Sequence, residues 1–246
     1  MPCISTERGC GSTSEWIPLG TLPASRPYFL LNAAMTLDGK IATRGGDTKL
    51  SDIVDWHYVH GIRARVDAIM VGVNTVLKDN PSLQVKFHSI QKYPRRVIVD
   101  SRGRTPLDAN VICRDAVHYQ TILCCTRLID PERKRAYENA GVKVLLINDD
   151  GRVDPLAMAE ALFAEGIHTV LCEGGGSLNW SILVADLIDE IRLFVAPVVA
   201  GGTEATGLFG GSGFETLTQS PAFQLHSVEK RENFVTLRYT KIKPVK

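Results

Sequence analysis

Short apolar segments recur along the chain and are separated by polar stretches. Most of them are continuous rather than alternating, which is typical of β-strands covered on both faces. Such strands are found in parallel sheets that carry helices on each side. The pattern therefore predicts strands over residues 28–35, 67–72, 95–100, 121–126, 143–148, 168–173, 191–199 and 234–240.

Helices are predicted between these strands. Residues 130–141 and 154–166 each begin with Asp-Pro and end with glycine, as expected for an N-cap, a first helical position and a helix end. Two more candidates cover residues 51–66 and 176–187. The alternation of strand and helix predicts a three-layer α/β fold with a mainly parallel central sheet. The last apolar run resembles half of a hairpin, so we expect an antiparallel C-terminal edge.

Composition is that of an ordinary globular protein, with 246 residues, 44% hydrophobic and 22% charged. Residues 1–25 are polar and broken by Gly and Pro, so we interpret them as a loose N-terminal extension before a single domain over residues 26–246. The net charge of +1 gives no reason to expect a nucleic-acid or membrane partner. No apolar run approaches the roughly 20 residues that span a bilayer.

Cysteine usage favours a cytoplasmic protein. The six cysteines show no C-x-x-C spacing and no histidine at metal-site intervals, so we expect no metal site. Cys124, Cys125 and Cys172 lie in apolar strand-like runs, where a free cysteine behaves as a small hydrophobic residue. We therefore expect structural thiols in a reducing cytoplasm.

The stretch CEGGGSLNW, residues 172–180, places three glycines between a predicted strand and a predicted helix. Backbone N–H groups at a helix N-terminus form an anion site, and glycines let a phosphate approach the backbone. The stretch is neither a G-x-G-x-x-G motif after a first strand nor a P-loop. A tight turn without a ligand is the alternative interpretation.

Two further polar segments follow predicted strands. NAAMTLDGKIA, residues 32–42, contains an Asp-Gly turn signal and leads into a Gly-rich loop of the kind that borders ligands. In the second segment Asn74, Thr75 and Asp79 come directly after a strand, where polar groups tend to face the ligand crevice of an α/β sheet. The alternatives are a plain surface loop and a short capped helical turn.

Five motifs, in order along the chain, carry a resemblance to a known family. They are LNAAMTLDGKIA, RARVDAIMVGVNTVLKDNPSL, RRVIVDSRGRTP, LCEGGGSLNWSIL and IDEIRLFVAPVVAGG. Together they resemble the reductase of riboflavin biosynthesis, which occurs alone or as the C-terminal half of a bifunctional deaminase-reductase. The similarity begins at residue 27 and runs almost to the C-terminus. It implies a dihydrofolate-reductase-like fold.

The resemblance also implies a reaction and a set of contacts. NADPH would reduce the ribose of a 6-ribosylaminopyrimidinone 5′-phosphate by hydride transfer to C1′, and stand-alone members often act before the ring is deaminated. Cofactor contacts of the family carry over to Ala34, Thr75, Asp79, Ser101, Gly174, Gly175, Gly176, Ser177, Leu178 and Asn179. Substrate contacts carry over to Thr48, Arg63, Leu83, Lys86 and Glu173, with Lys86 in place of an arginine.

These residue types suit the chemistry. Arg63 can bind a phosphate through two N–H groups, and Lys86 adds a point charge. The electrophile is an opened, imine-like form of the ribosylamine, so a nearby acid can assist the hydride transfer. Asp38 and Glu173 are the candidate catalytic residues, and a turn-capping or hydrogen-bonding role is the alternative for each.

Three further expectations concern the cofactor and the assembly. Arg102 and Arg104 follow a predicted strand and would bind the 2′-phosphate that distinguishes NADPH from NADH, with Arg127 as a second option. A strained or cis peptide bond is expected within residues 174–176. A homodimer is expected from the resemblance, with residues 191–199 and the C-terminal strand as apolar edge surface.

Other functions stay open at this point. The alternatives are the deaminated 5-aminouracil substrate, a pterin- or dihydrofolate-type reductase on the same scaffold, and a catalytically silent nucleotide-binding module. The zinc deaminase signature, H-x-E with P-C-x-x-C, does not occur in the chain, so we expect no deaminase activity.

Overall fold

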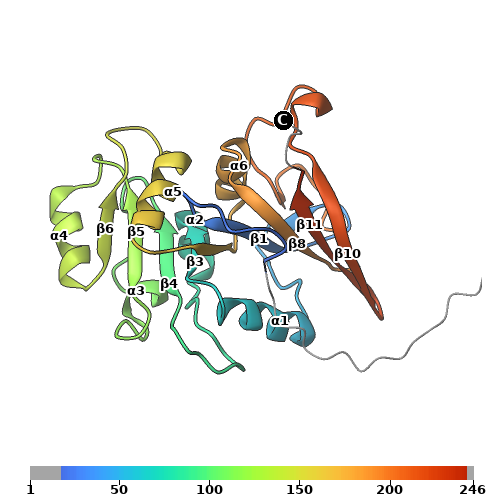
Figure 1. The fold of residues 1–246 in the computed structure, drawn as a ribbon, viewed down its shortest axis with the longest axis horizontal. Coiled ribbons are helices and arrows are strands. Elements are labelled where there is room, and N and C mark those ends of the chain that lie inside the picture. The colour runs from blue at the N-terminus through green and yellow to red at the C-terminus, as the bar shows by residue number, and fades with distance from the viewer. Residues whose placement is uncertain (1–17, 243–246) are drawn as a thin grey trace, which may run out of the picture.

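The computed structural model describes residues 18–242. Its centre is a nine-stranded sheet in the order β10-β11-β8-β1-β7-β3-β4-β5-β6 (Figure 1). These strands are β1 (Tyr28–Met35), β3 (Ala68–Gly72), β4 (Arg95–Val99), β5 (Thr121–Cys125), β6 (Lys143–Leu146), β7 (Thr169–Cys172), β8 (Ile188–Val195), β10 (Phe223–Arg231) and β11 (Phe234–Lys241).

The strands from β8 across to β6 are parallel, whereas β10 and β11 are antiparallel to their neighbours. This arrangement confirms the predicted α/β fold with an antiparallel C-terminal edge. A separate two-stranded sheet pairs β2 (Lys40–Ala42) with β9 (Thr206–Gly207). The sequence pattern did not predict this small sheet, because strands of two and three residues carry no periodic signal.

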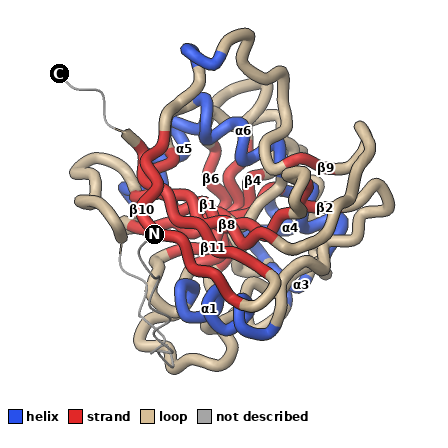
Figure 2. Tube along the Cα trace, turned by 90° about the vertical axis from the view of Figure 1, so that its right-hand side faces the viewer, coloured by secondary structure: helices blue, strands red, loops and turns tan. Residues whose placement is uncertain are grey.

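Helices cover both faces of the large sheet (Figure 2). Successive residues of β1 alternate between two cores: Phe29 and Leu31 pack with α5 and α6, whereas Tyr28 and Leu30 pack with α1, α3 and α4. Both faces of the strand are therefore apolar, which is why its sequence reads as a continuous run. The helices are α1 (Ile53–Arg63), α2 (Val73–Asp79), α3 (Asn110–Cys113), α4 (Pro131–Asn139), α5 (Pro155–Ala164) and α6 (Gly176–Val184), with a 3₁₀ turn at Leu217–Gln219.

The predicted helix ends are confirmed at α4 and α5. Asp130 and Asp154 act as N-caps, and their side chains accept hydrogen bonds from backbone amides in the first turn. Gly141 and Gly166 follow the two helices with φ values of 80° and 74°, in the region that favours glycine. Local sequence alone therefore determined where these helices begin and end.

Two predictions about the strands need correction. Strand β8 ends at Val195 rather than at residue 199, and it lies between β1 and β11. It therefore offers no edge for a second subunit, because both its hydrogen-bonding sides are paired. Strand β11, the predicted C-terminal edge strand, is likewise paired on both sides, with β8 and β10. The edge strands of the sheet are β10 and β6, and Leu225 and Val228 of β10 are 47% and 54% exposed.

The cysteine prediction is confirmed for the strand residues, since Cys124, Cys125 and Cys172 are buried and unpaired. The extension predicted over residues 1–25 lies largely outside the described residues. In the described part, the Leu19 amide donates to Glu190 at 3.3 Å. No helix within residues 18–242 has the length and apolar character needed to cross a membrane.

Candidate active site

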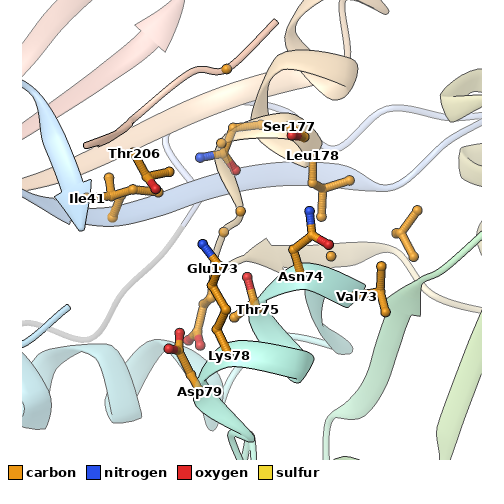
Figure 3. A pocket seen from close by; sticks show the side chains of 18 of the residues that line it. Ile41, Val73, Asn74, Thr75, Lys78, Asp79, Glu173, Ser177, Leu178 and Thr206 are labelled. Carbon is orange, nitrogen blue, oxygen red and sulfur yellow. The ribbon is translucent and has the colours of Figure 1, made fainter. Parts of the chain in front are cut away.

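A cavity of about 1010 Å³ opens at the carboxyl ends of the parallel strands. Its walls include Asn32 and Ala34 of β1, Gly72 at the end of β3, Val99 of β4 and Glu173 directly after β7. Ligands of open α/β sheets bind at this edge, and the volume is that of a site for a large ligand. Figure 3 shows part of its lining, with Thr75, Lys78 and Asp79 of α2 close to Glu173.

The glycine turn forms one wall of this cavity. Gly174 and Gly175 have φ values of 113° and 96°, and α6 begins at Gly176. Of the expected strained or cis peptide bond, the cis alternative is wrong, because residues 18–242 contain no cis peptide bond. The chain turns from β7 into α6 through two successive glycines in a backbone region that other residues rarely adopt, so no cis bond is needed. Ser177 and Leu178 of the first turn of α6 also line the cavity.

A strap, residues 196–210, crosses the N-terminus of α6. The Gly210 amide donates to the Gly176 carbonyl oxygen at 2.9 Å, and Asn179 Nδ2 donates to the Leu208 carbonyl oxygen at 2.8 Å. Asn179 is fully buried. Asn179 borders the cavity, but its side-chain amide binds the strap to the helix. Thr206 of the strap also lines the cavity.

Helix α2 supplies the predicted residues Thr75 and Asp79. It begins at Val73, directly after β3, and its N-cap is Gly72 with no side-chain hydrogen bond, so the alternative in which Asn74-Thr75 caps a short helical turn is wrong. A Cβ on Gly175 would lie 3.3 Å from Thr75 Oγ1, so the glycine turn and α2 approach each other closely. Burial raises the pKa of Asp79. Lys78 of the same helix lines the cavity as well.

Arginines gather at the β4 end of the cavity. Arg102 and Arg104 line it as predicted, together with Arg152 from the loop before α5. Ser101 fixes this corner, because its Oγ accepts a hydrogen bond from the Val153 amide at 3.0 Å. Arg127, the second option in the sequence analysis, does not line the cavity and instead forms an ion pair with Asp149 at 2.8 Å.

The opposite end of the cavity lies against α1 and its preceding loop. Thr48, the predicted substrate contact, lines it together with Ser51 and Trp56. Asp55 also lines this end, although it is only 4% exposed, and it forms an ion pair with the buried Arg192 at 2.8 Å. This end of the cavity is thus polar, and the Asp55 carboxylate in its wall is paired with a buried arginine.

Arg63 and Glu173 meet at the centre of the cavity. Arg63 Nε and Nη2 donate to the two carboxylate oxygens at 2.7 Å and 2.6 Å, and Nη1 donates to the Gln84 carbonyl oxygen at 2.9 Å. The Arg63 fork therefore faces Glu173, and each Glu173 oxygen accepts one of its hydrogen bonds. The substrate contact of Arg63 and the catalytic role of Glu173 stay predictions.

Asp38 does not line the cavity, so the structure does not support it as a catalytic acid. Its carboxylate accepts hydrogen bonds from Thr36 Oγ1 at 2.7 Å and from the amides of Ala200 and Gly201 at 3.1 Å and 2.8 Å. The Thr36 hydrogen bond, followed by those from the strap amides, lowers the pKa of Asp38 to about 2. Asp38 anchors the strap instead.

Leu83 and Lys86 also lie outside the cavity lining. Leu83 is buried with a φ of 48°, and the Lys86 amide donates to His60 Nδ1 at 2.9 Å. Their segment therefore packs behind α1. All other predicted site residues line the cavity: Ala34, Thr48, Arg63, Thr75, Asp79, Ser101, Glu173, Gly174, Gly175, Gly176, Ser177, Leu178 and Asn179.

Sequence reasoning missed several lining residues, above all Asn32, Asp55, Trp56 and Arg152. A signal existed for two of them. Asn32 interrupts the apolar run of β1, and Asp55 falls on the buried face of α1. A polar residue at a core position is unusual enough to mark a site.

Known proteins are similar to this chain in sequence and in fold. The RibD C-terminal domain model matches residues 27–237. The 2,5-diamino-6-ribosylamino-4(3H)-pyrimidinone 5′-phosphate reductase of Methanothermobacter thermautotrophicus is 39% identical over 204 residues, which cover 81% of this chain and 91% of that protein. The protein of the same name from Aquifex aeolicus is 37% identical over 207 residues, covering 82% and 91%.

Solved structures agree. Acinetobacter baumannii RibD, form 2, has a TM-score of 0.73 at 28% identity, covering 89% of this chain and 59% of that chain. The riboflavin biosynthesis reductase Rib7 of Saccharomyces cerevisiae has a TM-score of 0.68 at 20% identity, covering 91% and 93%, which shows likeness of fold. The chain therefore belongs to the RibD C-terminal domain family and is an oxidoreductase of riboflavin biosynthesis.

Proposed function

We propose that this chain reduces 2,5-diamino-6-ribosylamino-4(3H)-pyrimidinone 5′-phosphate with NADPH. The observation that carries the proposal is a single cavity with a glycine turn and arginines at one end and a buried carboxylate at the other. The relatives named for this substrate match more than four fifths of the chain. When bound, NADPH supplies the hydride that reduces C1′ of the opened sugar.

The glycine turn suits the pyrophosphate of the cofactor. Backbone N–H groups at the start of α6 attract anions, and Gly175 leaves open the space next to Thr75 that a side chain would fill. Thr75 and Ser177 add hydroxyl groups on the two sides of the turn. The chain's contribution to hydride transfer is to hold the two ligands in contact and to exclude water.

The arginines at the β4 end suit the 2′-phosphate of NADPH. Arg102, Arg104 and Arg152 come from two loops and border the same part of the cavity. Guanidinium groups bind phosphate oxygens through charge-assisted hydrogen bonds, and NADH lacks this phosphate.

We predict that replacing Arg102, Arg104 and Arg152 together by alanine reduces the preference for NADPH over NADH by about tenfold or more, since each lost charge-assisted hydrogen bond costs roughly 1.5–3 kcal/mol. Steady-state kinetics with each cofactor measure the ratio. Arg127→Ala is the control, because Arg127 is paired with Asp149 outside the cavity. An unchanged ratio in the triple variant would refute the assignment.

The buried carboxylate suits the ring of the diamino substrate. A 2-amino-4(3H)-pyrimidinone presents an exocyclic amino group, and Oδ2 of Asp55, the oxygen outside the ion pair with Arg192, can accept a hydrogen bond from it. The deaminated compound presents a carbonyl oxygen where the amino group was, and this oxygen would face the carboxylate. Asp55 therefore favours reduction before deamination over the alternative order.

The decisive experiment is an NADPH-oxidation assay with three compounds. We expect turnover with the diamino compound, weaker turnover with the deaminated 5-aminouracil compound, and none with dihydrofolate. Asp55→Asn should lower kcat/KM for the diamino compound by about tenfold or more, because a buried hydrogen-bond partner is lost. Equal turnover of both pyrimidines by the wild-type protein would overturn the substrate assignment.

We also propose a cytoplasmic homodimer. The β10 edge carries unpaired strand positions and the exposed Leu225 and Val228, which suits pairing with a second copy. The buried free cysteines suit a reducing compartment. Light scattering at micromolar concentration tests the dimer, and a monomeric mass would contradict it.

A further inference from the structure

Arg192 lies behind the α1 end of the cavity and does not line it. This residue of β8 is 2% exposed, and its Nη1 is 2.8 Å from Asp55 Oδ1 and 2.9 Å from Asn32 Oδ1. Its guanidinium also lies over the Tyr58 ring, 4.2 Å from the centroid. Arg192 thus joins two cavity residues that come from different elements, Asn32 of β1 and Asp55 of α1.

These contacts determine which atoms the two partners can offer a ligand. An arginine has only donors, so the Asn32 oxygen faces Arg192 and the Asn32 amino group remains as a donor. On Asp55, Oδ1 is the oxygen in the ion pair, which leaves Oδ2 for another partner. The α1 end therefore combines one amide donor with one carboxylate acceptor.

We propose that Arg192 is a positioning residue that selects the 2-amino form of the pyrimidine by orienting Asp55 and Asn32. This inference rests on the proposed function. Its physical basis is that Arg192 Nη1 contacts one oxygen of each partner and so fixes the Asn32 amino group and Asp55 Oδ2 as the groups left for the ring. Without Arg192, the site would lose its discrimination against the 2-oxo ring of the deaminated compound.

The test compares Arg192→Met and Arg192→Lys with the wild-type protein. Kinetics with the 2-amino and 2-oxo pyrimidine phosphates give the ratio of the two kcat/KM values, and fluorescence titration gives the NADPH affinity. We expect Arg192→Met to raise KM for the 2-amino compound and to lower the ratio by about tenfold. NADPH affinity should stay near the wild-type value, because the glycine turn is unchanged.

Arg192→Lys keeps the buried charge and is the milder change. Both contacts come from Nη1, and a lysine ammonium nitrogen ends one bond short of that position. We therefore expect a folded protein in which the ratio of the two kcat/KM values still falls at least about threefold. A role in stability alone would lower the melting temperature of the variants without moving the ratio, which makes the ratio the informative readout.

Arg238→Met is the matched control. Arg238 lies opposite Arg192 on the neighbouring strand β11, and it forms an ion pair with the fully buried Glu190 at 2.6 Å. Neither Arg238 nor Glu190 lines the cavity. We expect this variant to lose stability while its ratio stays at the wild-type value.

The inference is overturned if either Arg192 variant binds NADPH and keeps the wild-type ratio. It is also overturned if neither variant folds, since Arg192 would then serve the fold rather than substrate selection. Wild-type protein that turns over neither pyrimidine would refute the proposed function itself. Active wild-type protein with unaffected variants would refute only the role of Arg192.

Discussion

Adjacent glycines in the turn before α6 meet different surroundings. A Cβ on Gly175 would point to Thr75 on the cavity side, whereas a Cβ on Gly176 would lie 2.7 Å from the Gly207 carbonyl oxygen in the strap. The first contact involves a side chain that can move, and the second involves backbone. Two adjacent glycines therefore differ in their surroundings: Gly175 faces a cavity side chain, and Gly176 packs against the backbone of the strap.

We predict that Gly175→Val weakens NADPH binding by about tenfold or more, because the side chain occupies space next to the phosphate site and strains a backbone with φ of 96°, at a cost of roughly 1–3 kcal/mol. Fluorescence titration with NADPH measures the loss. Gly141→Val is the control, because Gly141 has a similar φ of 80° and a Cβ there would meet no atom within 4 Å. Wild-type affinity in a folded Gly175→Val protein would show that the glycines only make a turn.

At the scale of elements, the strap links the Asp-Gly segment, residues 32–42, to the glycine turn, residues 174–176. Asp38 holds its beginning through Ala200 and Gly201, and the Gly176 carbonyl oxygen holds its end through Gly210. Strand β9 pairs with β2 in between, which brings Ile41 and Thr206 into the cavity wall. The Asp-Gly turn and the glycine turn thus support one wall from two sides.

We predict that Asp38→Asn lowers kcat/KM only about threefold to tenfold, because an amide oxygen replaces part of the lost hydrogen bonding. Loss of a general acid would instead lower kcat by about 10²–10⁴. Steady-state kinetics at saturating NADPH distinguish the two outcomes. Asp47→Asn, in the same loop region but outside the cavity lining, is the control. A fall in kcat of about 10²-fold or more would support Asp38 as a catalytic acid.

At the scale of the whole molecule, α1 and the loop after α2 are joined by a neutral histidine. His60 is 1% exposed, and its Nδ1 accepts the Lys86 amide hydrogen bond. Burial, with smaller contributions from the charges of Arg63 and Lys86, lowers the pKa of His60 from 6.5 to about 3. Protonation of this ring removes the acceptor, so it opposes folding.

We predict a corresponding loss of stability in mild acid. The folded-state pKa is depressed, so the unfolded chain binds more protons between pH 6.5 and about 3, and stability falls as pH decreases through that window. Between pH 6.5 and 5 the loss from His60 is about 1.5 kcal/mol. Urea unfolding of wild type and His60→Gln across this range measures it, since glutamine keeps an acceptor but does not titrate. Parallel pH profiles for the two proteins would contradict the prediction.

The sequence pattern by itself determined the strands, the capped helices and the fold class, whereas most of the predicted cavity lining came from the family resemblance. Continuous apolar runs report burial on both faces, and Asp-Pro and glycine signals act within a few residues, so these features need no knowledge of distant contacts. The glycine turn was readable for the same reason, because the positive φ values of Gly174 and Gly175 are a local backbone feature that favours glycine.

Only the tertiary structure decided what the charged side chains do. Arg63 and Glu173 lie far apart in the chain and form an ion pair. Asp38 accepts a hydrogen bond from the strap, and Arg192 forms an ion pair with Asp55. Each role depends on which opposite charge or amide the fold places within hydrogen-bonding distance. A residue type indicates which hydrogen bonds are available, but the partner that uses them is set by long-range packing.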